Sequence, residues 1–460
     1  MNELSCFKSY DVRGQLGKNL DEDIAYRIGR AFALVLGAKT VVCGRDGRES
    51  SPTLVMALAN GLMDSGADVL DIGLCGTEEV YFATDHYGAD GGIMVTASHN
   101  PIDYNGFKLV RSGARPLSAD NGMRPIHDMA ASQKFGPERQ KGTRKEVFSR
   151  DAYTDRVLSF VTPPLIRNLN VVVNAGNGVA GPTFDYIAER LEENGANIEF
   201  TRVNHVPDAT FPNGIPNPLL PENQPVTSQA VKNAGADFGV AWDGDFDRCF
   251  LFDEFGNFID GEYIVGLLAA AFLKKAPGAS IVHDARIMWN TQAIVEAAGG
   301  QAVTSKTGHP LMKQKMRDVD AIYGGEMSAH HYFRGFMYCD SGMIPWLLVA
   351  EFLSESGKTL SELVADMKAN FPSSGEINFR VSDPVEVSRQ FEEKYLPECQ
   401  SLERLDGLSL DMGRWRVNLR SSNTEPLLRL NVESRGDRSL LNAKVSEIRA
   451  FLTQFGTISD

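Results

Sequence analysis

The sequence has no long apolar run. LLAAAF at 267–272 is far shorter than the ~18 residues that cross a membrane, so it predicts one buried face of a helix. The N-terminal MNELSCFKSYDVRG has no basic stretch followed by an apolar core, so we expect no secretory signal peptide. Paired cysteine spacings are also missing, which indicates reduced thiols in a cytoplasmic protein. The six cysteines are Cys6, Cys43, Cys75, Cys249, Cys339 and Cys399.

Basic residues are outnumbered, with 46 Lys and Arg against 60 Asp and Glu and a formal net charge of −14. A charge of this sign disfavours broad binding to nucleic acid or to an anionic membrane. It leaves a small anionic substrate open, because a local cluster of arginine and lysine can still bind phosphate. We therefore expect small molecules as partners, and neither nucleic acid nor membrane. Monomer and dimer both stay open.

An internal repeat organises most of the 460 residues. KTVVCG at 39–44, LNVVVNAG at 169–176 and ASIVHDA at 279–285 each begin a strand, helix, glycine and strand pattern. Each unit continues into a further strand and a polar loop: GADGGIMVTASHN, GADFGVAWDGDFD and DVDAIYGGEMSAHH. Helix and strand alternation of this kind predicts an α/β fold with doubly wound, mixed or parallel sheets.

The C-terminal segment follows another plan. EINFRV predicts a strand, 385–396 a polar helix, WRVNLRSSNTEPLLRLNVESR two strands around a loop, and 438–455 an amphipathic helix. The sequence therefore predicts three similar mixed-sheet α/β domains and a smaller α+β C-terminal domain. We place them at residues 1–146, 147–255, 256–367 and 368–460.

The segment MVTASHNPIDYNGFK at 94–108 places Ser98 on a sharp turn after a short apolar strand. Open α/β sheets expose catalytic groups at this edge, so Ser98 is a candidate nucleophile. The G-x-S-x-G signature of a serine hydrolase is missing. His99 is adjacent in sequence, which makes it a poor base for Ser98 and a possible phosphate ligand. Lys108 could be a solvated surface lysine or a catalytic group.

The loop Asp243-Gly-Asp-Phe-Asp-Arg248 carries carboxylates at alternate positions. Asp243, Asp245 and Asp247 repel one another unless a cation lies among them, although a solvated acidic turn is the simpler alternative. An EF-hand is a rival because Glu254 falls at its twelfth position. Its sixth position holds Arg248 instead of glycine, and the flanks are strand-like. Mg²⁺, completed by a phosphate oxygen, fits this loop better.

Two later loops carry candidate binding residues. Glu326 and Ser328 alternate in Gly324-Gly-Glu-Met-Ser-Ala-His-His331, and a carboxylate beside a hydroxyl suits adjacent sugar hydroxyls. His330 and the weaker candidate His331 could instead be polar core residues. Arg420 opens RSSNTEP, which is either a phosphate cradle or an ordinary polar hairpin turn.

These loops, TASHNP, DGDFDR, GEMS and RSSNTEP in this order, resemble the phosphoserine, metal, sugar and phosphate loops of the α-D-phosphohexomutase family over essentially the whole chain. The resemblance implies four domains around a central cleft. GEMS is most similar to the phosphomannomutase and phosphomannomutase/phosphoglucomutase branch. It implies reversible interconversion of mannose 6-phosphate and mannose 1-phosphate through a hexose 1,6-bisphosphate, feeding GDP-mannose and polysaccharide synthesis. Dual specificity for glucose phosphates, a phosphatase and a non-catalytic sugar-phosphate sensor stay as alternatives.

The resemblance also implies roles for individual residues. Ser98 would carry the phosphoryl group, and Asp243, Asp245 and Asp247 would hold Mg²⁺ with a phosphoserine oxygen. His99, Lys108 and Arg248 would stabilise the transferring charge or assist proton transfer. The residues expected to bind substrate are Tyr10, Arg13, Arg286, His309, Glu326, Ser328, His330, Arg420, Ser422, Asn423 and Thr424. Arg286 replaces a lysine, and Ala329 a glycine, that many relatives have.

Overall fold

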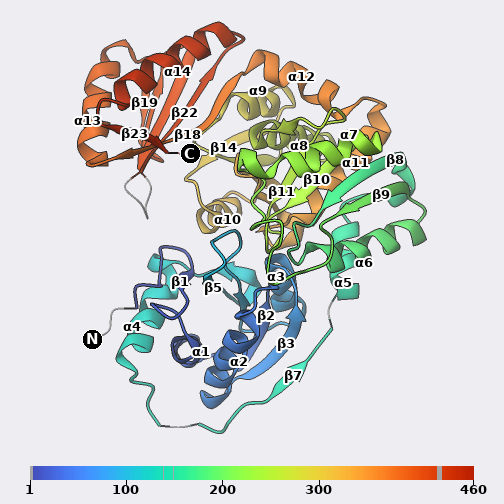
Figure 1. Ribbon diagram of the computed structural model, residues 1–460, viewed down its shortest axis with the longest axis vertical. Coiled ribbons are helices and arrows are strands. Elements are labelled where there is room, and N and C mark those ends of the chain that lie inside the picture. Colours follow the sequence, from blue (N-terminus) through green and yellow to red (C-terminus); the bar gives the residue numbers. More distant parts are fainter. Residues whose placement is uncertain (1–3, 138, 149, 422–426, 460) are drawn as a thin grey trace. The chain divides into compact units, whose positions relative to one another are not determined.

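The computed structural model of the chain describes residues 4–137, 139–148, 150–421 and 427–459. It divides into two compact units, residues 1–258 with 330–359 and residues 259–329 with 360–460 (Figure 1). Within the described residues, no helix combines the length and the apolar character needed to cross a lipid bilayer.

The first unit begins with a mixed sheet. Its strands are β1 (Val12–Gln15), β2 (Thr40–Arg45), β3 (Asp68–Leu74), β4 (Gly91–Val95), β5 (Tyr104–Arg111), β6 (Arg115–Pro116) and β7 (Arg144–Glu146). The strand order is β1-β5-β4-β2-β3-β7, and β6 pairs with β5. The strands β4, β2, β3 and β7 are parallel, whereas β5 runs antiparallel to both its neighbours. The helices are α1 (Glu22–Leu36), α2 (Ser51–Asp64), α3 (Thr77–His86) and α4 (Arg124–Ser132).

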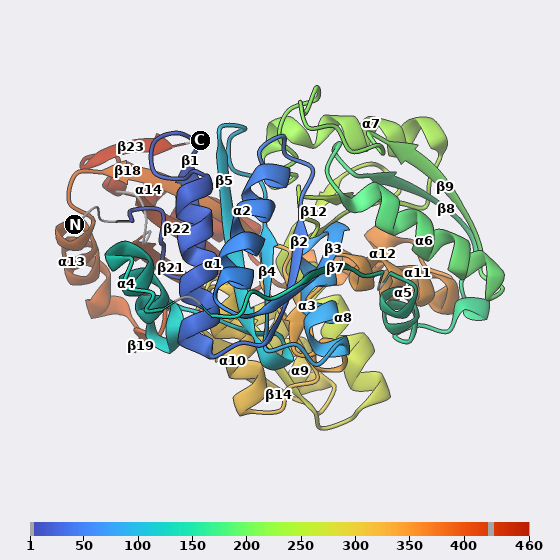
Figure 2. The same cartoon turned by 90° about the horizontal axis from the view of Figure 1, so that it is seen from below.

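Helices α1 and α2 lie side by side (Figure 2). Helix α1 begins after Asp21, whose carboxylate accepts the Ile24 N–H at 2.8 Å, and ends at Gly37 in the left-handed conformation. The two helices approach closely at Gly29, where an added Cβ would lie 2.2 Å from the carbonyl oxygen of Leu58. Only glycine allows this contact, which covers the apolar core of the sheet.

A second mixed sheet follows in the same unit. Its elements are α5 (Arg150–Leu158), β8 (Arg167–Asn174), α6 (Ala180–Glu193), β9 (Asn197–Val203), α7 (Pro225–Ala234), β10 (Phe238–Trp242) and β11 (Cys249–Phe252), followed by β12 (Phe258–Ile259). Strands β9, β8 and β10 are parallel, and β11 returns antiparallel beside β10. The unit also holds the antiparallel pair β16 (His331–Phe333) and β17 (Cys339–Asp340) and helix α11 (Met343–Ser356).

The second unit joins part of the third repeat to the C-terminal segment. The repeat contributes α8 (Gly261–Lys275), β13 (Ser280–Asp284), α9 (Trp289–Ala297), β14 (Gln301–Ser305), α10 (His309–Asp318), β15 (Tyr323–Gly325) and α12 (Leu360–Asn370). Strands β14, β13 and β15 are parallel. The C-terminal elements are β18 (Ser373–Val381), α13 (Pro384–Tyr395), β19 (Ser401–Glu403), β20 (Leu408–Asp411), β21 (Trp415–Ser421), β22 (Leu427–Ser434), α14 (Arg438–Leu452) and β23 (Gly456–Ser459). They form a sheet of order β19-β20-β21-β22-β18-β23.

The predicted repeat and fold class are confirmed. Strands β4, β10 and β15 each run parallel beside the first strand of their repeat, which is β2, β8 or β13. The three polar loops that leave β4, β10 and β15 therefore start from equivalent sheet positions. The four domain boundaries stay predictions, since each compact unit takes part of the segment 256–367.

Glu78 joins three segments of the first unit. It is buried at the start of α3 and accepts hydrogen bonds from Tyr153 Oη in α5 (2.5 Å), from Ser341 Oγ (2.7 Å) and from the Gly342 N–H (2.5 Å). Burial raises the pKa of Glu78 to about 8, although these donors oppose the shift. Because Ser341 and Gly342 precede α11, this carboxyl group ties α3, α5 and α11 together.

This shift predicts a pH-dependent stability. The folded pKa of Glu78 lies above its ordinary value of 4.5, so the folded chain binds the extra proton between these values. The resulting stabilisation is complete below pH 4.5 and is lost as the pH rises towards 8, by about 1.4 kcal/mol per pH unit. Glu78→Gln cannot ionise and should flatten this part of the profile. Urea midpoints between about pH 5 and about pH 8 measure it.

Glu199→Gln, at an exposed position of β9, serves as the control and should keep the wild-type profile. Parallel profiles for wild type and Glu78→Gln would contradict the assignment.

Candidate functional site

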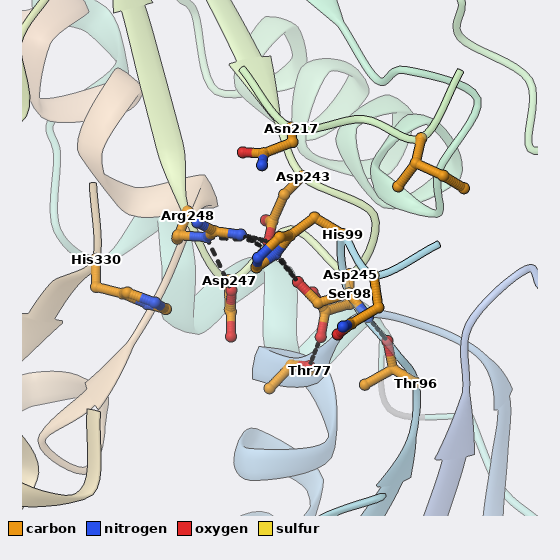
Figure 3. Close-up of polar contacts among 12 residues, drawn as sticks. Thr77, Thr96, Ser98, His99, Asn217, Asp243, Asp245, Asp247, Arg248 and His330 are labelled. Atoms are coloured by element: carbon orange, nitrogen blue, oxygen red, sulfur yellow. Dashed lines mark hydrogen bonds and ion pairs between the residues drawn. The ribbon is translucent and has the colours of Figure 1, made fainter. Parts of the chain in front are cut away.

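The serine loop leaves β4 and returns into β5. Ser98 is 4% exposed and adopts a φ of 49°, a left-handed conformation that disfavours residues with a Cβ. Its N–H donates to Thr96 Oγ1 at 2.8 Å, which fixes the turn. Ser98 Oγ donates to Asp243 Oδ2 at 2.8 Å and lies 2.9 Å from His99 Nδ1 (Figure 3). The candidate nucleophile therefore contacts the acidic loop directly.

The acidic loop leaves β10 at the equivalent sheet position. Asp243, Asp245 and Asp247 are buried, and each offers an oxygen within 4.8 Å of the others. A Cβ added at Gly244 would lie 2.5 Å from the carbonyl oxygen of Ser98, so glycine is what lets the two loops meet. The interpretation as a solvated acidic turn is therefore wrong.

Two cations partly neutralise these carboxylates. Lys108 Nζ donates to Asp245 Oδ2 at 2.7 Å and to Asp247, and Arg248 Nη2 donates to Asp243 Oδ2 at 2.6 Å. Lys108 is itself buried, which excludes the interpretation as a surface lysine. Burial raises the pKa of Asp243 and of Asp245, but Arg248 and Lys108 respectively outweigh it and hold both pKa values low. Burial raises the pKa of Asp247 to about 6.

The donor set fits a hard divalent cation. Among the described residues, the buried Oδ1 atoms of Asp243 and Asp245 have no hydrogen-bond partner. Buried carboxylate oxygens without donors are costly, and oxygens of this kind are the preferred ligands of hard cations. Since three carboxylates face two cationic side chains, a bound cation would relieve the remaining repulsion.

His99 is held by charged neighbours. Arg248 Nη2 donates to His99 Nδ1, and Asp243 Oδ2 lies 3.8 Å from the same nitrogen. Although the His99 side chain is 41% exposed, desolvation by its surroundings and then the charge of Arg248 lower its pKa to about 4. His99 is therefore neutral near pH 7, with Nδ1 as an acceptor beside the serine hydroxyl.

The start of α3 contacts the acidic loop through Thr77. Thr77 Oγ1 donates to Asp245 Oδ2 at 2.5 Å and accepts from Lys108 Nζ at 3.3 Å. Its backbone N–H donates to the Asp245 carbonyl oxygen at 3.1 Å. Phe246 packs so closely over Gly76 that an added Cβ would lie 2.2 Å from its ring. The start of α3 therefore supports the acidic loop.

Further predicted residues lie in the first unit. Arg13 Nη1 donates to the Thr96 carbonyl oxygen at 2.5 Å, and half-buried Tyr10 precedes this arginine in the chain. His330 Nδ1 lies 3.0 Å from Asp340 Oδ2. Burial lowers the pKa of His331 to about 3, which fits the interpretation as a polar core residue.

The sugar-loop candidates lie in the second unit, after β15. Glu326 is buried, and its Oε1 accepts the Gly308 N–H at 2.9 Å immediately before His309 begins α10. Arg286 Nη2 donates to Ser328 Oγ at 3.2 Å and to Asp284 Oδ2 at 2.7 Å. The structure therefore brings Arg286 and Ser328 together.

Ala329 adopts a φ of 68°. This left-handed conformation costs an alanine about 1 kcal/mol. Its N–H donates to the Glu326 carbonyl oxygen at 3.0 Å, which keeps the turn closed.

Arg420 is one of three arginines around a single carboxylate. Arg420 Nη2 donates to Glu376 Oε2 at 2.9 Å, while Arg429 Nη1 lies 3.3 Å and Arg286 Nη1 3.6 Å from the same group. Within the described part of the chain, the buried Nε atoms of all three arginines have no hydrogen-bond partner. This cluster can therefore accept a further anion. The predicted partners Ser422, Asn423 and Thr424 lie outside the described residues.

Sequence reasoning missed three supporting residues. Thr77 begins a helix and Glu376 lies in a strand. Neither belongs to a sequence motif that would indicate a site. Arg48 ends the sequence Arg45-Asp-Gly-Arg48, where arginines beside a glycine are only a weak indication of a site. Their partners lie far away in the sequence, so only the folded chain reveals their contacts.

Comparisons with protein families match all four segments. Models described as phosphoglucomutase/phosphomannomutase α/β/α domains I, II and III match residues 5–136, 151–256 and 260–371, and the C-terminal domain model matches residues 376–450. The chain is 58% identical to a phosphomannomutase of Salmonella montevideo, over 98% of this chain and 100% of the relative. It is 56% identical to a phosphomannomutase of Escherichia coli K12, over 99% and 100%.

Solved structures show the same fold. A phosphoglucomutase/phosphomannomutase family protein from Burkholderia thailandensis matches with a TM-score of 0.87 and 32% identity, over 100% of both chains. An Aspergillus fumigatus N-acetylphosphoglucosamine mutase in complex with GlcNAc-6P and magnesium matches with a TM-score of 0.61 and 15% identity, over 98% of this chain and 96% of that chain.

The contact of Thr77 with Asp245 predicts an effect on cation affinity. Thr77→Val keeps the shape of the side chain but removes the hydroxyl group that orients this carboxylate. We expect the affinity for a divalent cation to fall by about 10- to 100-fold. Titration calorimetry measures it, and Thr77→Ser, which keeps the hydroxyl, is the matched control. Equal affinities for the three proteins would refute the role of Thr77.

Proposed function

Because the chain belongs to the phosphoglucomutase/phosphomannomutase family, we propose that it is a phosphomannomutase, which reversibly interconverts mannose 6-phosphate and mannose 1-phosphate. The observation that carries the proposal is the contact of Ser98 Oγ with Asp243 at 2.8 Å, inside a buried cluster of carboxylates. A hydroxyl group on a strained turn beside such a cluster suits a phosphoryl carrier. The catalysed step would be cytoplasmic and would supply GDP-mannose and polysaccharide synthesis.

Phosphoryl transfer would proceed in two halves. Phosphorylated Ser98 gives its phosphoryl group to O1 or O6 of the bound sugar, so that a hexose 1,6-bisphosphate forms and the seryl oxygen is released. After the bisphosphate reorients, its other phosphate returns to Ser98. The proton that the attacking sugar hydroxyl loses ends on the released seryl oxygen, and the resulting Ser98 hydroxyl donates to Asp243 Oδ2 at 2.8 Å.

Asp243, Asp245 and Asp247 would hold Mg²⁺, which would neutralise charge on the transferring phosphoryl group. Lys108 and Arg248 would stabilise the same charge. Burial lowers the pKa of Lys108, but Asp245 and Asp247 outweigh it, so the pKa is raised and Lys108 stays protonated. Lys108 is therefore an electrostatic group and not a base.

The remaining candidates would bind the sugar and its non-reacting phosphate. Glu326 and Ser328 suit sugar hydroxyls, because a buried carboxylate and a hydroxyl both offer acceptors. Arg420 would bind phosphate, with Ser422, Asn423 and Thr424 completing the loop. The other proposed substrate-binding residues are Tyr10, Arg13, Arg286, His309 and His330.

The substrate assignment rests on the relatives. Mannose and glucose differ at C2, and we assign no residue to this position. We therefore propose glucose phosphates as weaker substrates. A phosphatase would leave the Arg420 cluster and the Glu326 loop without a purpose, and a sensor would leave Ser98 without one.

Ser98→Ala should abolish turnover, because it removes the phosphoryl carrier. Intact-mass analysis should detect one phosphate on part of the wild-type chains and none on the variant. A coupled assay should give wild-type kcat/KM values that fall from mannose 1-phosphate to glucose 1-phosphate to N-acetylglucosamine 1-phosphate. Release of inorganic phosphate without interconversion would indicate a phosphatase, and full activity of Ser98→Ala would refute the proposal.

Arg420→Ala should lower kcat/KM by about 10- to 100-fold, since charge-assisted hydrogen bonds to phosphate bind and orient the sugar. Steady-state kinetics with mannose 1-phosphate measure the change. Arg414→Ala is the matched control, because this arginine is 76% exposed and pairs with Asp437. Unchanged kinetics of Arg420→Ala would place the phosphate contact elsewhere.

A further inference from the structure

The Arg48 side chain binds backbone carbonyl groups of the serine loop. Arg48 belongs to the loop that connects β2 to α2, and it is 2% exposed. Its Nη1 donates to the carbonyl oxygens of Pro101 (2.8 Å) and Tyr104 (3.1 Å), and its Nη2 donates to those of Ser98 (3.0 Å) and Asn100 (2.7 Å). One guanidinium group thus donates hydrogen bonds to four carbonyl groups of the loop that carries Ser98.

These contacts use all the hydrogens on both Nη atoms, since each nitrogen carries two. Arg48 therefore has no Nη hydrogen left for a phosphate or a sugar unless it releases the loop. This distinguishes it from Arg420, whose Nη2 contacts only a carboxylate. The Nε atoms of both arginines have no hydrogen-bond partner among the described residues, but that of Arg48 is buried 3.5 Å from Asp46 Oδ2. Because both Nη atoms hold the loop and Nε is buried against Asp46, the contacts of Arg48 favour a role in positioning over substrate binding.

The loop needs such a partner. Ser98 adopts a φ of 49°, and its turn points four carbonyl groups at the same buried guanidinium group. A planar guanidinium presents its N–H groups in a fixed fork, which suits a ring of carbonyl oxygens. A lysine ammonium offers at most three donors from one point and cannot span these positions.

Arg48 is itself held in place from two sides. Asp46 Oδ1 accepts the Arg48 backbone N–H at 3.0 Å and the Ser51 hydroxyl at 2.5 Å. The guanidinium carbon lies 5.6 Å from the centroid of the Phe211 ring, which comes from the loop between β9 and α7. The Arg48 guanidinium group thus also contacts a segment of the second mixed sheet, from which the acidic loop leaves.

We propose that Arg48 is a positioning residue that holds Ser98 in register with Asp243 for phosphoryl transfer. The role in transfer rests on the proposed function. The carbonyl oxygen of Ser98 that accepts from Arg48 also faces Gly244, where an added Cβ would lie only 2.5 Å away. A shift of this carbonyl group therefore moves Ser98 Oγ relative to its 2.8 Å contact with Asp243. Displacements of this size reduce catalysis strongly, because transfer requires alignment.

The test uses Arg48→Lys and Arg48→Met in the full chain. We expect kcat to fall by about 100-fold while KM for mannose 1-phosphate stays within about 3-fold, because the serine loop uses all the Nη hydrogens of Arg48 and its Nε is buried. Arg48→Lys should not restore kcat, since an ammonium group cannot donate to all four carbonyl groups at once. Arg45→Lys and Arg45→Met are the controls. Within the described ranges the Arg45 side chain makes one hydrogen bond, to the Asp46 carbonyl oxygen at 3.3 Å, so these variants should keep kcat.

Hydrogen exchange without substrate tests the positioning independently of any activity. Both Arg48 variants should exchange faster than wild type in residues 98–104, with the exchange of β8 and β9 unchanged. If Arg48→Met does not fold, Arg48→Lys carries the test. Wild-type kcat or unchanged loop exchange in Arg48→Lys would overturn the proposal, and a raised KM with unchanged kcat would assign Arg48 to substrate binding. A wild-type enzyme without mutase activity would refute the proposed function and leave the exchange result standing.

Discussion

The repulsion among three buried carboxylates constrains the rest of the first unit. Asp243, Asp245 and Asp247 occupy one short loop and lie away from water, where like charges interact strongly. Lys108 and Arg248 balance part of this charge. The Oδ1 atoms of Asp243 and Asp245 have no hydrogen-bond partner in the part of the chain that the structure describes, so they can act as ligands of a cation. The surrounding elements act mainly to hold these groups close together. The charged groups that phosphoryl transfer needs are therefore preorganised, and they do not have to move into place during the reaction.

The repeated α/β plan explains how distant segments meet at this cluster. The serine loop and the acidic loop both follow a strand that runs parallel to the first strand of its repeat. Strands β5 and β11 then return antiparallel, so each loop is a tight connection with both ends fixed by a sheet. Fixed ends limit the movement of Ser98 and Asp243, and glycine at position 244 allows their backbones to touch. Precise positioning therefore comes from backbone packing as much as from the side chains that perform the chemistry.

The second unit uses the opposite charge in a comparable way. Glu376 lies among Arg286, Arg420 and Arg429, so a protein carboxylate partly satisfies three cations that would otherwise repel one another. The buried pair of Arg416 and Glu433, at 2.8 Å, secures the same sheet. A cluster that keeps unused donors can take up a phosphate without the cost of bringing arginines together at that moment. The proposed mutase thus has an acidic centre for the reacting group and a basic centre for the non-reacting phosphate.

The sequence by itself determined the α/β repeat, the α+β tail, the family and the loops that carry Ser98, Asp243, Glu326 and Arg420. These features are local: hydrophobic periodicity, glycines and short motifs lie within a few residues of one another. Tertiary structure alone decided which side chains support them. Arg48 reaches carbonyl groups about fifty positions away, and Thr77 reaches Asp245 across a separation of 168 residues. Burial also decided that Lys108 is an ion-pair partner, and the packed surroundings and charge of Arg248 decided that His99 is neutral, because both depend on contacts between distant segments.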